Sequence, residues 1–214
     1  NGVSNAAINL TGDGAYVNLN WIEDLHPASG ELKKSISIWF SMNGGSMNPR
    51  LFQWGCGSSN RDLYIYSFGT SDEQREMTID GVGVVSVLGQ TWNHLVVTWD
   101  FAGGGLNRAY LNGVQIAENE SVLIENWLIS GDINIGRKPC SAYDSWGGLV
   151  DDIGFWERIL TAEEVNSLFT TPFMPGCNDL TACNYNEEAT SDDGSCIPSG
   201  CMETDACNYN ALAE

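Results

Sequence analysis

Short apolar and alternating runs, punctuated by Gly, Asn and Asp, fill the first 171 residues. β-Branched and aromatic residues dominate these runs, which is typical of strands. The expected strands are residues 35–40, 63–66, 84–87, 95–99, 109–111, 133–135 and 149–156. Asn112-Gly113 after one of these runs is the dipeptide of a tight hairpin turn. Many short strands with turn signals predict an all-β fold, a two-sheet antiparallel sandwich or jelly roll.

One short helix is expected near the end of this region. Thr161 has the character of an N-cap residue, and Glu164 stands at the position of a capping-box acid. Val165, Leu168 and Phe169 then follow at helical spacing. The pattern predicts one helix after the last strand.

The composition changes after residue 171. Residues 172–214 contain 8 acidic and no basic residues, and five of the seven cysteines. Gly176-Cys177 and Gly200-Cys201 begin two similar segments with a period of 24 residues. The expected organisation is a sandwich domain at 1–171, a linker at 172–175, a Cys-rich repeat at 176–199 and a truncated repeat at 200–214. The chain begins at Asn1 without Met and stops at Glu214 within a repeat, so we expect a piece of a longer protein.

Cysteine density this high in a polar stretch is typical of disulfide-stapled extracellular modules. The tail cysteines expected in disulfides are Cys177, Cys183, Cys196, Cys201 and Cys207. Five is an odd number, so at least one pairs outside the tail or stays free, and the connectivity remains open. A zinc cluster is the rival interpretation, but the tail has no C-x2-C pair and no nearby His.

The net charge and the hydropathy of the chain exclude some classes of partner. The net charge of −19 opposes binding to nucleic acid, which needs clustered Lys and Arg. No apolar run approaches the roughly 20 residues of a membrane span, so we expect no membrane insertion. Cations, neutral ligands and proteins remain as partners.

The order of motifs resembles laminin-G-like, concanavalin-A-type jelly-roll domains. The motifs that carry the resemblance are Ala7–Leu10, Ser37–Phe40, Trp92–Asp100, Tyr110–Val114, Asn134–Gly136, Gly148–Ile153 and Arg158–Glu164. The tail resembles the Gly-Cys-x-Asp-x-x-Ala-Cys-Asn-Tyr-Asn…Asp-Asp-Gly-Ser-Cys repeats of large secreted proteins from marine microbes. The resemblance implies an extracellular location, secreted or at the cell surface.

Calcium is the cofactor that the resemblance implies, held between the first hairpin and the last long strand. The matching ligands are Asp151, the Gly12 carbonyl and Asp13. Strand alternation places Asp151 on the same face as Ile153 and Phe155, where an acid needs a cation or hydrogen bonds. The alternative is that Asp151 accepts backbone hydrogen bonds at the sheet end.

Two positions depart from the family pattern, which more usually has Asp where this chain has Thr11 and Ala15. Asp192-Asp193-Gly194 in the tail resembles half of a calcium loop, without the full ladder of acids. A simple turn accounts for this second motif.

Two Gly-rich polar loops, 51–61 and 140–148, each contain one of the two cysteines of the domain. In an oxidising compartment we expect Cys56 and Cys140 to pair, which stabilises the fold by about 4 kcal/mol in the chain-entropy model. The paired loops would display a recognition surface.

The candidate ligand-binding residues on this surface are Trp54, Asn60, Arg61, Arg137, Tyr143, Asp144 and Trp146. Flat aromatic rings beside amide, Arg and carboxylate groups suit sugars, and they suit a protein partner equally well. The alternative is that Trp54 and Trp146 belong to the core.

Catalysis has little support in the residues. Related glycoside hydrolases use a Glu-x-Asp-x-x-Glu strand, which this chain lacks, and the acidic run 72–76 has the wrong spacing. His94 matches a structural His of the family signature, and His26 lies in a predicted loop. Asn9 and Asn119 begin tripeptides that fit the N-glycosylation pattern, the second in a predicted loop.

The sequence therefore predicts a non-catalytic adhesion module that binds a glycan or a surface protein, with calcium as a possible aid, on a larger surface protein. The alternative is a structural building block of a cell-surface filament or appendage, which assembles with itself or with other surface proteins and has no free ligand. A glycan-cleaving enzyme fits the residues least well.

Overall fold

The computed structural model describes residues 7–11, 14–19, 33–45, 49–55, 63–68, 74–101, 104–120, 132–138, 145–171, 176–190, 192 and 194–197. The chain divides into two compact units, one formed by Gly2–Phe169 and the other containing Thr170–Glu214. The first unit holds both sheets, and the second holds the cysteine-rich tail.

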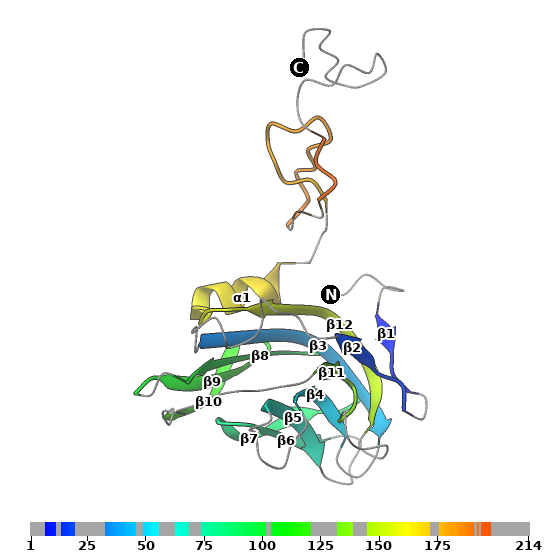
Figure 1. Cartoon of the computed structure of the whole chain (residues 1–214), viewed down its shortest axis with the longest axis vertical. Coiled ribbons are helices and arrows are strands. Elements are labelled where there is room, and N and C mark those ends of the chain that lie inside the picture. The colour runs from blue at the N-terminus through cyan, green and yellow to red at the C-terminus, as the bar shows by residue number, and fades with distance from the viewer. Residues whose placement is uncertain are drawn as a thin grey trace, which may run out of the picture. The chain divides into compact units, whose positions relative to one another are not determined.

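Two six-stranded antiparallel sheets form the first unit, as the sequence predicts (Figure 1). Sheet A has the order β1 (Ile8–Asn9), β12 (Trp146–Trp156), β3 (Lys33–Gly45), β8 (Asn93–Asp100), β9 (Leu106–Leu111) and β10 (Val114–Glu120). Sheet B has the order β2 (Val17–Leu19), β11 (Ile133–Ile135), β4 (Arg50–Trp54), β5 (Leu63–Phe68), β6 (Gln74–Ile79) and β7 (Gly83–Leu88). The jelly-roll sandwich is confirmed.

The core lies between the two sheets because alternate residues of each strand point inward. On β3 these are Ile36, Ile38 and Phe40, none more than 1% exposed. Phe52 and Trp54 of β4 meet them from sheet B. The inner faces of the two sheets are therefore buried against each other, and only the outer faces can make other contacts.

A bulge in β12 changes which residues face this core. Asp152 has a φ of 44°, and the register with β3 shifts at this point. After the bulge, Ile153 and Phe155 pack against the core. Asp151 comes before it and pairs with Trp39, on the outer face of sheet A. The prediction that Asp151 shares a face with Ile153 and Phe155 is therefore wrong, because one extra residue reverses the alternation.

Close approach of β12 to β3 makes Gly148 a sensitive position. A Cβ atom added there would overlap the carbonyl oxygen of Ser41. We expect Gly148→Ala to lower the free energy of unfolding by about 3 kcal/mol, because backbone must move apart inside the sheet. Gly104→Ala is the control, with open space around it and a φ of 73°, and is expected to cost about 1 kcal/mol. Urea unfolding of both variants measures the difference, and equal losses would contradict the role given to the strand contact.

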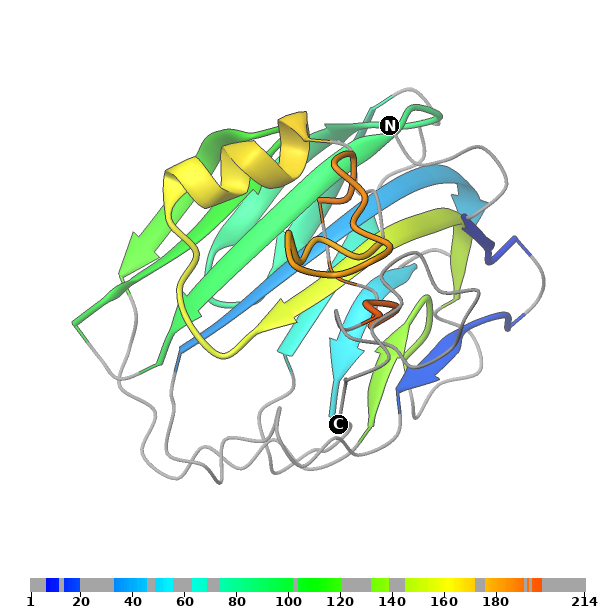
Figure 2. The same cartoon turned by 90° about the horizontal axis from the view of Figure 1, so that it is seen from above.

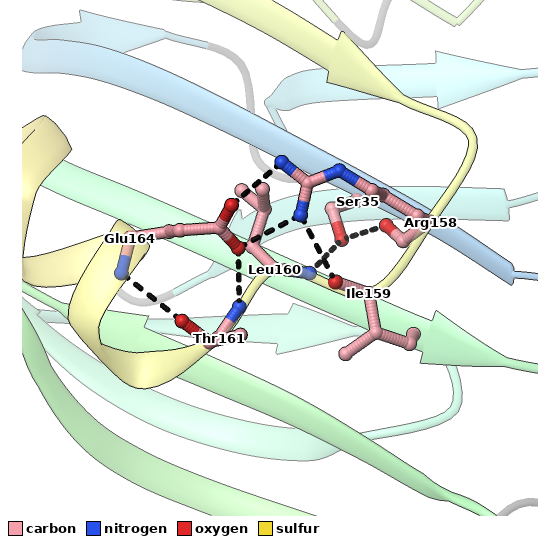
Figure 3. A network of polar contacts seen from close by, with 6 residues as sticks. All are labelled: Ser35, Arg158, Ile159, Leu160, Thr161 and Glu164. Carbon is pink, nitrogen blue, oxygen red and sulfur yellow. Dashed lines mark hydrogen bonds and ion pairs between the residues drawn. The ribbon is translucent and has the colours of Figure 1, made fainter.

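Helix α1 (Ala162–Thr170) follows β12 and packs on the outer face of sheet A (Figure 2). Its capping box is present: Thr161 N donates to Glu164 Oε2 (2.8 Å), and Glu164 N donates to Thr161 Oγ1 (3.3 Å) (Figure 3). Arg158 donates to both carboxylate oxygens of Glu164, and these hydrogen bonds lower the pKa of Glu164 to about 2. Within the described residues, no helix has the length and apolar character to cross a membrane.

The tail unit is held by disulfides. Cys177 bonds to Cys196, and Cys183 is also disulfide-bonded. The Asn184 side chain ties the unit together, since it donates to Ser195 O and accepts from Ile197 N. Disulfide formation is thus confirmed for these three cysteines. Cys201 and Cys207 lie outside the described residues, so the second repeat stays a prediction.

One hydrogen bond agrees with the interpretation of Asp192-Asp193-Gly194 as a simple turn. Asp192 Oδ1 accepts a hydrogen bond from Gly194 N at 3.0 Å, as in an Asx turn. Asp193 lies outside the described residues.

Candidate functional site

A row of aromatic side chains lies on the outer face of sheet B. On β5, Ile65 and Ser67 point into the core and are fully buried. Tyr64, Tyr66 and Phe68 therefore point outward, and all three are half-buried. The ring centroids of Tyr64 and Tyr66 are 5.7 Å apart, and those of Tyr66 and Phe68 are 6.2 Å apart. The three rings form a continuous stripe along the strand.

Arg50 on the neighbouring strand lies over this stripe. The register between β4 and β5 shifts after Arg50, which pairs with Tyr66. The central guanidinium carbon of Arg50 is 5.0 Å from the Tyr64 ring centroid and 4.4 Å from that of Tyr66. Both distances fit cation–π contacts, which orient the rings. We call Arg50, Tyr64, Tyr66 and Phe68 the aromatic platform.

Three carboxamide side chains continue the same face toward β2. Strand register places Asn18, Asn134, Gln53 and Tyr64 in one row across four strands. Asn18 Nδ2 donates to Asn134 Oδ1 (2.9 Å) and to Asp132 Oδ2 (3.0 Å). We call Asn18, Asn134 and Gln53 the amide row. Its members can both donate and accept hydrogen bonds.

The amide row is buried at one end and open at the other. Gln53 is 1% exposed and Asn134 is 2% exposed, whereas Asn18 is exposed. Gln53 Nε2 donates to Gly55 O, but Gln53 Oε1 accepts no hydrogen bond from the described residues. A buried acceptor without a partner is uncommon in folded proteins, so Gln53 Oε1 is an unusual feature of the amide row.

On its other side the platform continues as an open surface. Thr78 on β6 pairs with Tyr66 and is half-buried, and Val84 on β7 pairs with Thr78 and is 57% exposed. A small cavity lined by described residues lies elsewhere, between the sheets beside Lys34 and Trp99, and has room for about one water molecule. The outer face of sheet B therefore suits a ligand that lies on a surface.

The structure contradicts two of the predicted ligand-binding residues. Trp54 is 4% exposed and Trp146 is 1% exposed, and both belong to the core between the sheets. Trp146 packs edge-on against Phe40, with ring centroids 5.6 Å apart. Both tryptophans occupy inward positions of their strands, so neither can contact a ligand on the surface.

Arg137 is the one predicted ligand-binding residue that the structure describes near the surface. It is half-buried, and its guanidinium carbon lies 4.7 Å from the ring centroid of Tyr16, which is 42% exposed. The other predicted loop residues lie outside the described residues: Asn60, Arg61, Tyr143, Asp144, Cys56 and Cys140. The loop surface and its disulfide stay predictions.

The aromatic platform and the amide row are what the sequence argument missed. A signal for the platform exists, since Tyr64, Tyr66 and Phe68 recur with a period of two, although the predicted strand 63–66 stops before Phe68. Arg50 and Gln53 come from a second strand, and Asn18 and Asn134 from two others. Only strand pairing brings these groups together.

Of the predicted calcium ligands, only Asp151 belongs to the described residues. Asp151 follows Val150, which pairs with Ile8 at one end of β1, whereas Leu10, beyond the other end of β1, donates its N–H to Gly148 O. Gly12 and Asp13 lie outside the described residues. In the described part of the chain, no group of three His, Cys, Asp or Glu residues has the arrangement of a metal site. Calcium binding stays a prediction.

Asp152, next to the predicted ligand, is electrostatically unusual. Burial raises the pKa of Asp152, and the negative charge of Asp151 raises it further. Asp151 Oδ1 accepts a hydrogen bond from Asp152 N at 3.0 Å. This contact agrees with the alternative interpretation of Asp151, in which its carboxylate accepts backbone hydrogen bonds and binds no cation.

The two candidate glycosylation residues have exposed side chains. Asn9 Oδ1 accepts hydrogen bonds from Thr11 N (2.9 Å) and Thr11 Oγ1 (2.6 Å). Asn119 lies within strand β10, so its predicted place in a loop is wrong. Glycosylation at either residue stays a prediction.

His94 lies buried beneath α1. It is 1% exposed, and a hydrogen bond of 2.8 Å joins its Nε2 to Ser37 Oγ. Its ring stacks on Trp39 at 4.9 Å and on Phe169 at 6.0 Å between centroids. Burial lowers the pKa of His94 to about 4. These contacts give His94 a packing role inside the domain.

Solved structures share the fold at low sequence identity. A receptor binding domain matches with a TM-score of 0.56 at 16% identity, over 79% of this chain and 43% of its own. A heptameric SAP-like pentraxin from Limulus polyphemus has a TM-score of 0.52 at 16% identity, over 65% of this chain and 70% of its own. The botulinum neurotoxin DC binding domain, solved with rat synaptotagmin II, has a TM-score of 0.52 at 15% identity, over 72% and 39%.

The chain thus spans less than half the length of two of these three proteins. No curated protein matches the sequence. A family model described as the Concanavalin A-like lectin/glucanases superfamily matches residues 11–166, which include almost all strands of both sheets. The chain belongs to this superfamily.

Proposed function

We propose that the sandwich domain is a non-catalytic extracellular recognition module that binds a glycan through the aromatic platform. One observation carries the proposal: Arg50 is stacked over Tyr64 and Tyr66 on the outer face of sheet B. The rings are already oriented, so binding orders few side chains and loses little conformational entropy.

The chemistry of this face suits a sugar ring. The half-buried rings of Tyr64, Tyr66 and Phe68 offer apolar surface for the C–H side of a pyranose or furanose. Thr78 lies beside the platform, and Asn18 and Asp132 lie at the exposed end of the amide row; all three can hydrogen-bond to sugar hydroxyls. The net charge of −19 disfavours acidic glycans, so a neutral glycan is the expected class.

Disulfide bonding in the tail supports the extracellular assignment. Cys177 and Cys196 are bonded, and such bonds persist in oxidising compartments. The module is then one part of a larger surface protein, with the cysteine-rich units as its continuation.

Replacing Tyr66 by alanine is expected to weaken glycan binding about 30-fold, which corresponds to roughly 2 kcal/mol for a central aromatic contact. Tyr16→Ala is the matched control, because Tyr16 is also a tyrosine in contact with an arginine and is 42% exposed, but it is not part of the platform. A glycan array of the whole chain identifies a neutral ligand, and isothermal titration calorimetry then compares the two variants.

Loss of binding in Tyr66→Ala alone supports the platform. If Tyr16→Ala alone loses binding, the recognition surface lies beside Arg137, as the sequence argument expects. The calcium prediction is tested by repeating the titrations, together with thermal unfolding, in calcium and in a chelator. If calcium binds as predicted, the chelator lowers the affinity for glycan or the melting temperature, and Asp151→Asn abolishes this effect of the chelator.

A further inference from the structure

The internal repeat of the tail shows which residues one repeat shares with the next. Residues 176–190 align with residues 200–214, and eight of these fifteen positions are identical. In the first repeat the identical residues are Gly176, Cys177, Ala182, Cys183, Asn184, Tyr185, Asn186 and Ala189. Each of them can be compared with its contacts in the structure.

Contacts inside the first repeat account for most of these identities. Both cysteines are disulfide-bonded, and a Cβ atom added at Gly176 would lie 3.1 Å from the Cβ of Ala189. The side chains of Asn184 and Asn186 accept hydrogen bonds from backbone N–H groups of the same unit. Ala182 is half-buried. The fold of the repeat itself therefore requires these residues.

Tyr185 is the exception among the identical residues. Its side chain is 41% exposed and makes no hydrogen bond or ring contact with other described residues. Ile197, which is 44% exposed, lies beside the same segment, because its O accepts from Cys183 N (3.0 Å) and its N donates to Asn184 Oδ1 (2.8 Å). An exposed aromatic residue that recurs as Tyr209 indicates a contact outside the single repeat. We call Tyr185 and Ile197 the tyrosine face.

The second repeat has apolar residues at two positions where the first repeat has exposed polar residues. The aligned pairs are Asn178 with Met202, and Glu188 with Leu212. In the first repeat these two positions lie in adjoining segments, because Asn186 N donates to Cys177 O at 2.8 Å. If the second repeat has the fold of the first, its two apolar residues form one exposed patch. A repeat that follows another thus offers an apolar surface that the first repeat does not need.

The connection between the repeats is short. Four residue steps lead from Ile197 to Cys201, and a fully extended chain spans at most about 14 Å over this length. The second repeat therefore begins close to the tyrosine face, at an effective concentration on the order of millimolar, so a weak contact is enough to hold it. Residues 172–214 have acidic but no basic residues, so attraction between charges cannot supply this contact.

We propose that consecutive repeats of the tail dock on each other, with Tyr185 and Ile197 of the first repeat covered by Met202 and Leu212 of the second. The same contact recurs wherever one repeat follows another, so the repeats form a stiff array instead of a flexible chain. The proposal concerns the tail alone and does not depend on glycan binding by the sandwich domain.

NMR relaxation of the whole chain, with its disulfides intact, tests the proposal at the connection between the repeats. We expect backbone order parameters of about 0.85 at Ser199 and Gly200, as in a rigid segment, and values below about 0.6 in Tyr185→Ala. Met202→Asn is expected to have the same effect from the other side of the contact. It introduces the residue that the first repeat has at this position, so it is compatible with the fold of a repeat.

Tyr209→Ala is the matched control. It removes the same residue of the repeat, but a chain of residues 1–214 contains no third repeat that could cover Tyr209. The order parameters are expected to stay unchanged, and an equal fall in Tyr185→Ala and Tyr209→Ala overturns the proposal. Tyr185→Phe keeps the ring and is expected to keep the connection rigid, so a fall in this variant also overturns the apolar contact. Unchanged chemical shifts of residues 176–184 show that each variant is folded.

Salt gives an independent measurement. Screening weakens the repulsion between two acidic repeats, so raising the salt to about 0.5 M is expected to leave the connection rigid or to stiffen it. A connection that loosens in salt, or that is flexible in the unmodified chain, overturns the proposal. Tyr66→Ala, which tests the glycan site, is expected to leave these order parameters unchanged, so failure of one proposal is distinguishable from failure of the other.

Discussion

Replacing Trp146 by alanine is expected to lower the free energy of unfolding by about 3 to 5 kcal/mol, the cost of deleting a large buried aromatic side chain. The indole is 1% exposed and packs edge-on against Phe40 in the centre of the core. Its loss leaves a cavity between β12 and β3 that the neighbouring side chains fill only in part. Urea unfolding measured by circular dichroism gives the change directly.

Trp146→Phe is the control for this prediction. Trp146 Nε1 has no hydrogen-bond partner among the described residues, so phenylalanine removes no polar contact and keeps most of the packing. We expect it to cost less than half as much as alanine. If alanine is tolerated as well as phenylalanine, Trp146 is not the core residue described here. A loss of ligand binding in Trp146→Ala would report unfolding, since the side chain does not reach the surface.

Acid is expected to destabilise the domain through His94, by about 3 kcal/mol between pH 6.5 and pH 4. The pKa of His94 is about 4 in the folded domain and 6.5 when exposed. Between these values the unfolded chain binds a proton that the folded domain does not, so stability falls as the pH falls. Below about pH 4 both states are protonated and this contribution is constant. The size follows from about 1.4 kcal/mol per pKa unit.

The physical reason is the surroundings of the ring. An imidazolium ion needs two acceptors, but only Nε2 has a partner, Ser37 Oγ, while Nδ1 has none among the described residues. Trp39 and Phe169 stack on the ring and exclude water. Protonation therefore leaves a buried charge with an unsatisfied donor.

His94→Gln isolates this effect from that of the carboxylates. Urea unfolding of both proteins is measured from pH 7 to pH 4, and the difference between the two curves belongs to His94. We expect the unmodified domain to lose more stability over this interval than the variant. Parallel curves would show that His94 does not titrate differently in the folded domain.

Local patterns were enough to predict much of the fold. The runs that predict strands 35–40 and 95–99 lie within β3 and β8, because β-branched and aromatic residues favour a pleated, half-buried surface wherever they occur. The capping box at Thr161 and Glu164 formed as predicted, because both of its hydrogen bonds join residues three apart.

Predictions failed where a long-range contact decides the outcome. The bulge at Asp152 depends on how β12 pairs with β3, and it moved Asp151 to the opposite face from Ile153. Trp54 and Trp146 stand next to Gly-rich loops in the sequence, but the strands on which they lie direct them inward. Position along the chain does not reveal the face of a sheet until its partner strands are known.

The sequence by itself determined the strands, the helix cap, the two regions and the use of disulfides, because each depends on neighbouring residues or on composition. Only the tertiary structure decided which aromatic residues are accessible and that Arg50 lies over Tyr64 and Tyr66. These features arise from pairings between strands that are distant in the sequence. Side-chain burial and edge position are properties of the assembled sheets, so no single segment encodes them.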